Sequence, residues 1–124
     1  MDILSKFILP GILFLLTLVF GFIMSQMGKP YNGILFNVHK LIALGAVIVM
    51  GIQFFQALKT APTTALIIVL LVVAVLCIIA LFATGALMSM DKLDYTLTLN
   101  LHRITLVVLP IALALAVYLL GSKP

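Results

Sequence analysis

This chain has two histidines, His39 and His102, and they are its clearest candidates for a metal-binding or proton-transfer role. Imidazole ligates metals, donates and accepts hydrogen bonds, and exchanges a proton near neutral pH. Each histidine is followed directly by a cation, Lys40 or Arg103, and each pair lies within a long apolar stretch. Because an ionisable side chain is costly to keep in such a stretch, both histidines are candidates for a functional site.

The surroundings of the two histidines repeat along the chain. Residues 37–41 read Asn-Val-His-Lys-Leu and residues 100–104 read Asn-Leu-His-Arg-Ile, at an offset of 63. Upstream, residues 21–25 (Gly-Phe-Ile-Met-Ser) match residues 85–89 (Gly-Ala-Leu-Met-Ser) at an offset of 64. These polar and small residues are uncommon here and keep their order with one gap. We therefore interpret the chain as a tandem duplication, with repeats over residues 1–62 and 63–124.

Both histidines lie in stretches that have the composition of membrane-spanning helices. The chain is 65% hydrophobic and 8% charged, whereas soluble domains are about 45–50% apolar and about 25% charged. Four stretches reach the roughly 20 apolar residues that a spanning helix needs. They run from about Phe7 to Met24, Gly33 to Leu58, Thr63 to Ser89 and Asp94 to Leu120. We expect an integral membrane protein of the inner or plasma membrane, in contact with the lipid bilayer.

The connections between these stretches are short, so sequential helices should be antiparallel. The predicted fold is an all-α, up-down-up-down four-helix bundle forming a single transmembrane domain. Pro10 is tolerated in a first helical turn, Asp94 is a predicted N-cap, and Pro110 should kink the last helix. Three threonines are expected to bond back to their own helices: Thr17, Thr84 and Thr105.

Duplication of a two-helix unit leaves both copies in the same orientation, related by a pseudo-two-fold axis along the membrane normal. His39 and His102 are therefore predicted at one depth, about two turns inside their helices. Haem iron accepts two axial imidazoles, and four-helix bundles build cofactor sites from facing helices. We predict one haem b per chain with His39 and His102 as iron ligands. Gly21 and Gly85, on the other two helices, would let a flat ligand approach the backbone closely.

The polar neighbours of the histidines suit the same cofactor. A cation within the membrane needs an anionic partner or must reach toward the headgroups. Haem propionates would be such partners for Lys40 and Arg103. Asn37 and Asn100 could donate hydrogen bonds to the propionates or orient an imidazole nitrogen.

This arrangement resembles the four-helix core of membrane b-type cytochromes, meaning respiratory cytochrome b and the cytochrome b561-like proteins. The resemblance implies that His39 and His102 are axial ligands and that Gly21 and Gly85 provide clearance. It also implies electron transfer with a quinone or a redox partner protein. Those families usually carry two histidines per ligand helix and two haems, whereas this chain has one histidine per helix. We therefore expect an electron carrier or a membrane anchor of a larger complex, and no stand-alone catalyst.

Three other interpretations stay open. Thioether and imidazole ligands suit Cu(I), and four methionines lie at the histidine end of the predicted bundle: Met24, Met27, Met88 and Met90. A histidine beside a cation could bind a quinone or pass a proton without a prosthetic group. Alternatively, the histidines join helices by hydrogen bonds in a cofactor-free structural or accessory subunit.

The remaining composition excludes some functions and orients the chain. The single cysteine, Cys77, excludes an internal disulfide. The chain has a net charge of +4 but very little polar sequence. We attribute this charge to attraction between basic residues and lipid headgroups, and we expect no nucleic-acid partner. Lys6, Lys59 and Lys123 mark one end of the predicted bundle, against Lys29 and Lys92 in the connections at the other. If Lys40 and Arg103 serve the histidine site, the excess of positive charge predicts both termini in the cytoplasm. If they count as loop charges, the excess moves to the other end and the predicted orientation reverses.

Overall fold

The computed structural model describes residues 3–90 and 92–122, and all the regular elements in these ranges are helices. A short helix, α1 (Ile3–Lys6), precedes four long ones: α2 (Ile8–Met27), α3 (Gly33–Thr60), α4 (Ala65–Met90) and α5 (Tyr95–Ser122). The four long helices are each apolar and long enough to cross a membrane. The predicted all-α class and the four predicted spans are therefore confirmed.

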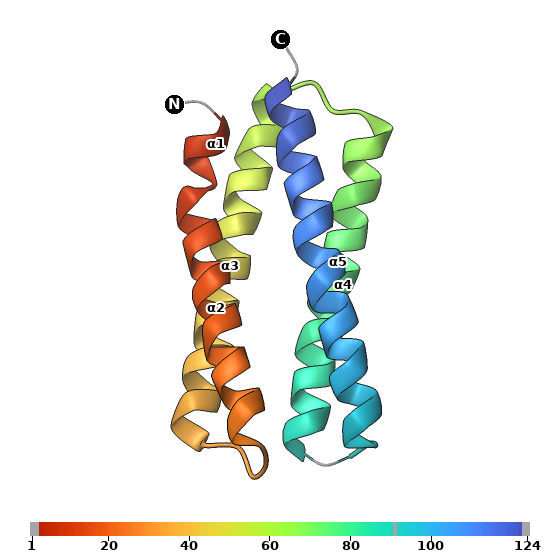
Figure 1. The fold of residues 1–124 in the computed structure, drawn as a ribbon. Helices are drawn as coiled ribbons and strands as arrows, with labels where there is room; N and C mark the ends of the chain where they lie inside the picture. Colours follow the sequence, from red (N-terminus) through yellow and green to blue (C-terminus); the bar gives the residue numbers. More distant parts are fainter. Residues whose placement is uncertain (1–2, 91, 123–124) are drawn as a thin grey trace. The chain divides into compact units, whose positions relative to one another are not determined.

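The chain divides into two compact units, residues 1–60 and 61–124. In the first unit α2 packs along α3, and in the second α4 packs along α5. Each unit is an antiparallel helical hairpin with one short connection (Figure 1). The boundary between the units falls at residue 60, compared with residue 62 for the predicted sequence repeats.

The second helix of each hairpin begins at a polar cap. Asp94 accepts a hydrogen bond from the backbone N–H of Leu97 on Oδ2 at 3.0 Å, so its predicted role as an N-cap is confirmed. Asn32 caps α3 in the same way, since its Oδ1 accepts from the N–H groups of Ile34 at 2.9 Å and Leu35 at 3.1 Å. Each cap satisfies donors that the helix cannot pair internally.

The first span differs from its prediction at the N-terminal end. Helical structure begins at Ile3 and is interrupted at Phe7, whose N–H donates to the carbonyl of Leu4 at 3.0 Å. Pro10 has no N–H to bond the carbonyl of Lys6, so the continuous ladder of α2 starts only after this point. Pro10 lies in the first turn of α2, as predicted.

The first hairpin packs through aromatic and small side chains. The rings of Phe7 and Phe54 lie 4.8 Å apart between centroids, tilted by 54°, and both side chains are buried. Ala46 and Ala57 on α3 are also buried. Small residues let helices approach closely, which matters in a bilayer because association there depends on packing and hydrogen bonds.

The second hairpin has a tighter core of small residues. Ile67 on α4 and Ala116 on α5 are fully buried, and Ala74 and Ala112 are nearly so. Cys77 is buried on α4. α5 continues as one helix through Pro110.

Large apolar side chains also cover the outside of the described helices. Ile34 is 75% exposed and Phe22 is 65% exposed, and many leucines, isoleucines and valines are similar. Water would solvate such a surface poorly, whereas lipid tails are as apolar as these side chains. This exposure supports an integral membrane protein. Of the charges used for orientation, Lys123 lies outside the described residues.

Candidate functional site

Each hairpin carries one histidine near the end that holds its connection. His39 is the seventh residue of α3 and His102 is the eighth residue of α5. At about 1.5 Å per residue, both lie about 9–11 Å along their helices. Both side chains are half-buried. The predicted depth of about two turns is therefore correct for each histidine within its own helix.

His39 is bound to the backbone of the neighbouring helix. Its Nδ1 lies 2.9 Å from the carbonyl oxygen of Thr17 on α2. A carbonyl oxygen can only accept, so the imidazole donates from Nδ1–H. In a neutral imidazole this places the lone pair on Nε2, the nitrogen available to a metal or to a hydrogen-bond donor.

Gly21 is the residue that makes this hydrogen bond possible. A Cβ placed on Gly21 would lie 2.9 Å from Cε1 of His39 and 3.4 Å from its Nδ1. The first distance is shorter than carbon atoms tolerate without displacement. Gly21 thus gives room to the imidazole of its own hairpin, an interaction that the sequence analysis did not predict.

His102 is bound to a side chain instead. Its Nδ1 lies 2.8 Å from Oγ1 of Thr84 on α4. The same hydroxyl lies 2.7 Å from the carbonyl oxygen of Ala80, which is a hydrogen-bond acceptor. The single hydroxyl hydrogen therefore goes to Ala80, because two oxygens that close would otherwise face each other with no hydrogen between them. Nδ1 of His102 then carries a hydrogen and donates to Thr84, which gives the same tautomer as in His39.

Gly85 holds a looser position than Gly21. A Cβ on Gly85 would lie 3.7 Å from Cε1 of His102, an ordinary van der Waals distance. The two glycines align in the sequence repeat, but only the first hairpin needs glycine for steric reasons. The second hairpin has space for a methyl group beside its imidazole.

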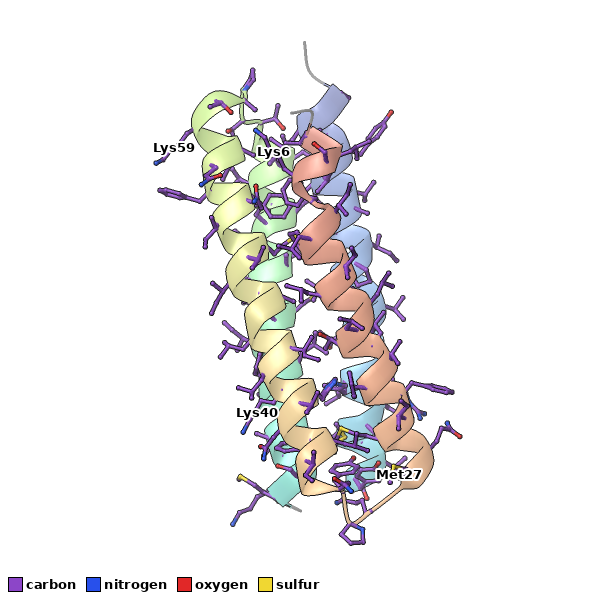
Figure 2. The ribbon with its side chains drawn as sticks, turned by 90° about the vertical axis from the view of Figure 1, so that its left-hand side faces the viewer. Lys6, Met27, Lys40 and Lys59 are labelled. Carbon is purple, nitrogen blue, oxygen red and sulfur yellow. The ribbon has the colours of Figure 1, made fainter. Side chains whose placement is uncertain are left out.

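The predicted polar neighbours lie away from these hydrogen bonds. Asn37, Lys40, Asn100 and Arg103 are all exposed. Nζ of Lys40 lies 5.4 Å from the centroid of the Phe36 ring, and the side chain projects from the side of α3 remote from α2 (Figure 2). The structure therefore joins each histidine to a threonine and a glycine of its own hairpin, and the asparagines do not orient Nδ1.

The methionines divide between two environments. Met24 and Met88 are each 6% exposed, whereas Met27 and Met90 are 59% and 54% exposed. Each hairpin thus has one buried and one exposed methionine near its connection. Within residues 3–90 and 92–122, no three His, Cys, Asp or Glu side chains cluster as a metal site. A haem with two axial ligands does not require such a cluster.

Three threonines were predicted only to bond back to their own helices. That prediction is confirmed, since Thr17 Oγ1 donates to Leu13 at 2.9 Å, Thr84 Oγ1 donates to Ala80, and Thr105 Oγ1 donates to Leu101 at 2.7 Å. The contacts of Thr17 and Thr84 with the histidines were not predicted. Their positions next to the repeated glycines could have predicted these contacts: Thr84 directly precedes Gly85, and Thr17 stands one helical turn before Gly21.

No protein-family model, curated protein or solved structure matches this chain.

Proposed function

We propose that this chain is a small membrane-bound b-type cytochrome. It binds one haem b through two axial imidazoles, one from His39 and one from His102. It exchanges electrons with a quinone or with a redox partner protein. The observation that supports this proposal is that Nδ1 of each histidine lies at hydrogen-bond distance from a group on the neighbouring helix, 2.9 Å from the Thr17 carbonyl oxygen for His39 and 2.8 Å from the Thr84 hydroxyl for His102.

The Nδ1–H tautomer is the one that a histidine ligand needs. Metal-bound histidines generally donate their other ring N–H to a carbonyl, a carboxylate or water, and this second bond fixes the ring and raises its basicity. Thr17 supplies a carbonyl for His39, and Thr84 supplies a hydroxyl for His102. The two hairpins thus meet one chemical requirement by different groups.

Exposed polar side chains near the histidines could bind the haem propionates. Lys40 and Arg103 are cations that can pair with haem propionates, and Asn37 and Asn100 stand one helical turn before them. When bound, a haem with two imidazole ligands supplies one-electron transfer without an open position for oxygen.

The deciding experiment is an absorption spectrum of the purified full chain in detergent, first oxidised and then reduced with dithionite. A pyridine haemochrome assay gives the stoichiometry, which we expect to be about one haem per chain. His39→Asn and His102→Asn are the informative variants, because an asparagine amide can replace the Nδ1 donor but offers no ligand in place of Nε2. We expect either variant to lose the low-spin spectrum.

A second candidate function has its own supporting observation. Both histidine hydrogen bonds cross between helices, and such bonds stabilise membrane hairpins by about 0.6 kcal/mol on average. The chain would then be a cofactor-free structural or accessory subunit. In that case the parent protein lacks a Soret band even after expression with added haem precursor. The same asparagine variants would keep the stability of the parent, because the interhelical bond survives.

A further inference from the structure

The groups that face Nδ1 of the two histidines differ in mobility: one is a backbone carbonyl and the other is a side-chain hydroxyl. The carbonyl of Thr17 belongs to the backbone of α2 and can only accept from His39. The hydroxyl of Thr84 can rotate, and it can donate as well as accept. Its present direction is set by Ala80, whose carbonyl oxygen lies at 2.7 Å, with the carbonyl of Leu81 at 3.2 Å as a second acceptor.

The steric surroundings show the same difference. The imidazole of His39 is confined by Gly21, where a Cβ would lie 2.9 Å from Cε1. A Cβ placed on Gly85 would lie 3.7 Å from Cε1 of His102, which is an ordinary contact distance. Nδ1 of His39 thus faces a backbone carbonyl, whereas Nδ1 of His102 faces a side-chain hydroxyl that can rotate.

We propose that Thr84 is a positioning residue for His102. The Thr84 hydroxyl selects the Nδ1–H tautomer by accepting its hydrogen while donating its own to Ala80. For His39 the group facing Nδ1 is the backbone carbonyl of Thr17. The Thr17 hydroxyl instead donates to the carbonyl of Leu13.

The test uses the full chain in detergent micelles with both histidines labelled with 15N. The 15N chemical shift distinguishes a protonated from an unprotonated ring nitrogen, and the spectra are recorded at a pH where both imidazoles are neutral. The His39→Asn variant leaves one histidine and so assigns the signals. Thr84→Val removes the hydroxyl while keeping the side-chain shape. Thr17→Val is the matched control, because it removes a hydroxyl from the same kind of helix position but leaves the carbonyl that His39 uses.

We expect Thr84→Val to change the His102 signals toward a mixture of tautomers and to leave those of His39 in place. Thr17→Val should change neither histidine. Thr84→Ser, which restores a hydroxyl, should restore the parent spectrum of His102 and serves as the second variant if Thr84→Val does not fold. The proposal is overturned if His102 is unchanged in Thr84→Val, or if Thr84→Ser shifts it as much as valine does.

A second readout rests on the proposed cytochrome function. An acceptor on Nδ1–H makes an axial imidazole a stronger donor to the oxidised iron. Thr84→Val should therefore raise the reduction potential of the haem, while Thr17→Val should leave it unchanged. If no variant or parent binds haem, the cytochrome proposal fails, but the NMR comparison still decides the role of Thr84.

Discussion

The imidazole of His39 lies so close to Gly21 that a methyl group at that glycine would stand 2.9 Å from Cε1 of the ring. The ring cannot simply move away, because its Nδ1 donates to the carbonyl of Thr17 at 2.9 Å. A glycine on one helix and a backbone carbonyl one turn earlier therefore define a single position for the histidine on the other helix. In this hairpin one missing Cβ and one hydrogen bond thus fix the position of the His39 ring.

Gly21→Ala should therefore destabilise the first hairpin. Forcing a methyl group into a packed contact costs about 1–3 kcal/mol, while replacing glycine by alanine within a helix returns about 1 kcal/mol. We expect a net loss of up to about 2 kcal/mol in a mixed-detergent unfolding titration. The His39 side chain should also leave Thr17, which 15N spectra of labelled histidine would report.

Gly85→Ala is the matched control for this substitution. Its methyl group would stand at an ordinary contact distance from His102, so only the gain in helix propensity remains. We expect this variant to be as stable as the parent or up to about 1 kcal/mol more stable. Equal stability losses for both alanine variants would contradict the asymmetry between the hairpins.

The sequence was sufficient to predict the four spans, the cap at Asp94 and the depth of each histidine. Those features depend on local properties: the length of an apolar stretch, the type of residue before it, and the number of residues from a helix start. The interruption at Phe7 could also have been predicted, because Pro10 lacks the N–H that would bond a carbonyl of the preceding turn.

The partners of the histidines could not be predicted, because they depend on how one helix is rotated against its neighbour. The sequence repeat aligns Gly21 with Gly85 and His39 with His102. In the structure, however, His39 contacts Thr17 and His102 contacts Thr84, which do not align in the repeat. Side-chain packing between the helices decides such contacts, and one apolar helix surface resembles another in composition.

The caps of α3 and α5 make a prediction about stability. Asn32→Ala and Asp94→Ala should each destabilise the chain by about 0.5–2 kcal/mol, because the N–H groups that they cap lose an acceptor. The measurement is again the midpoint of unfolding in mixed detergent. Asp94→Asn keeps an oxygen acceptor and should retain most of the stability. If it lost as much as Asp94→Ala, charge and not capping would explain the effect.

The cations beside the histidines make a prediction about haem binding. If Lys40 and Arg103 pair with propionates, Lys40→Gln and Arg103→Gln should weaken haem binding. An exposed ion pair contributes about 0.2–1 kcal/mol, so the affinity should fall by no more than about fivefold. The reduction potential should also fall, because a nearby positive charge disfavours the oxidised iron.

Lys59→Gln is the control for these two variants. Lys59 is also exposed and lies over an aromatic ring, with Nζ 4.4 Å from the centroid of Phe55. It stands at the end of the first hairpin opposite to Lys40 (Figure 2). A change in haem potential of equal size in Lys59→Gln would mean that overall charge, and not a local partner, is responsible.

The distribution of lysines makes a prediction about orientation. Lys6 and Lys59 lie at one end of the first hairpin and Met27 at the other (Figure 2). With Lys40 and Arg103 assigned to the histidine site, the positive-inside rule predicts that the lysine end lies in the cytoplasm. Two exposed glutamines near the ends of α2 and α3, Gln26 and Gln56, offer matched neutral positions for labelling. In a Cys77→Ala background, a membrane-impermeant maleimide should label Gln26→Cys on intact cells and Gln56→Cys only after permeabilisation. The reverse pattern would place the termini outside, together with Lys6 and Lys59, and would show that Lys40 and Arg103 contribute to the charge bias that orients the chain.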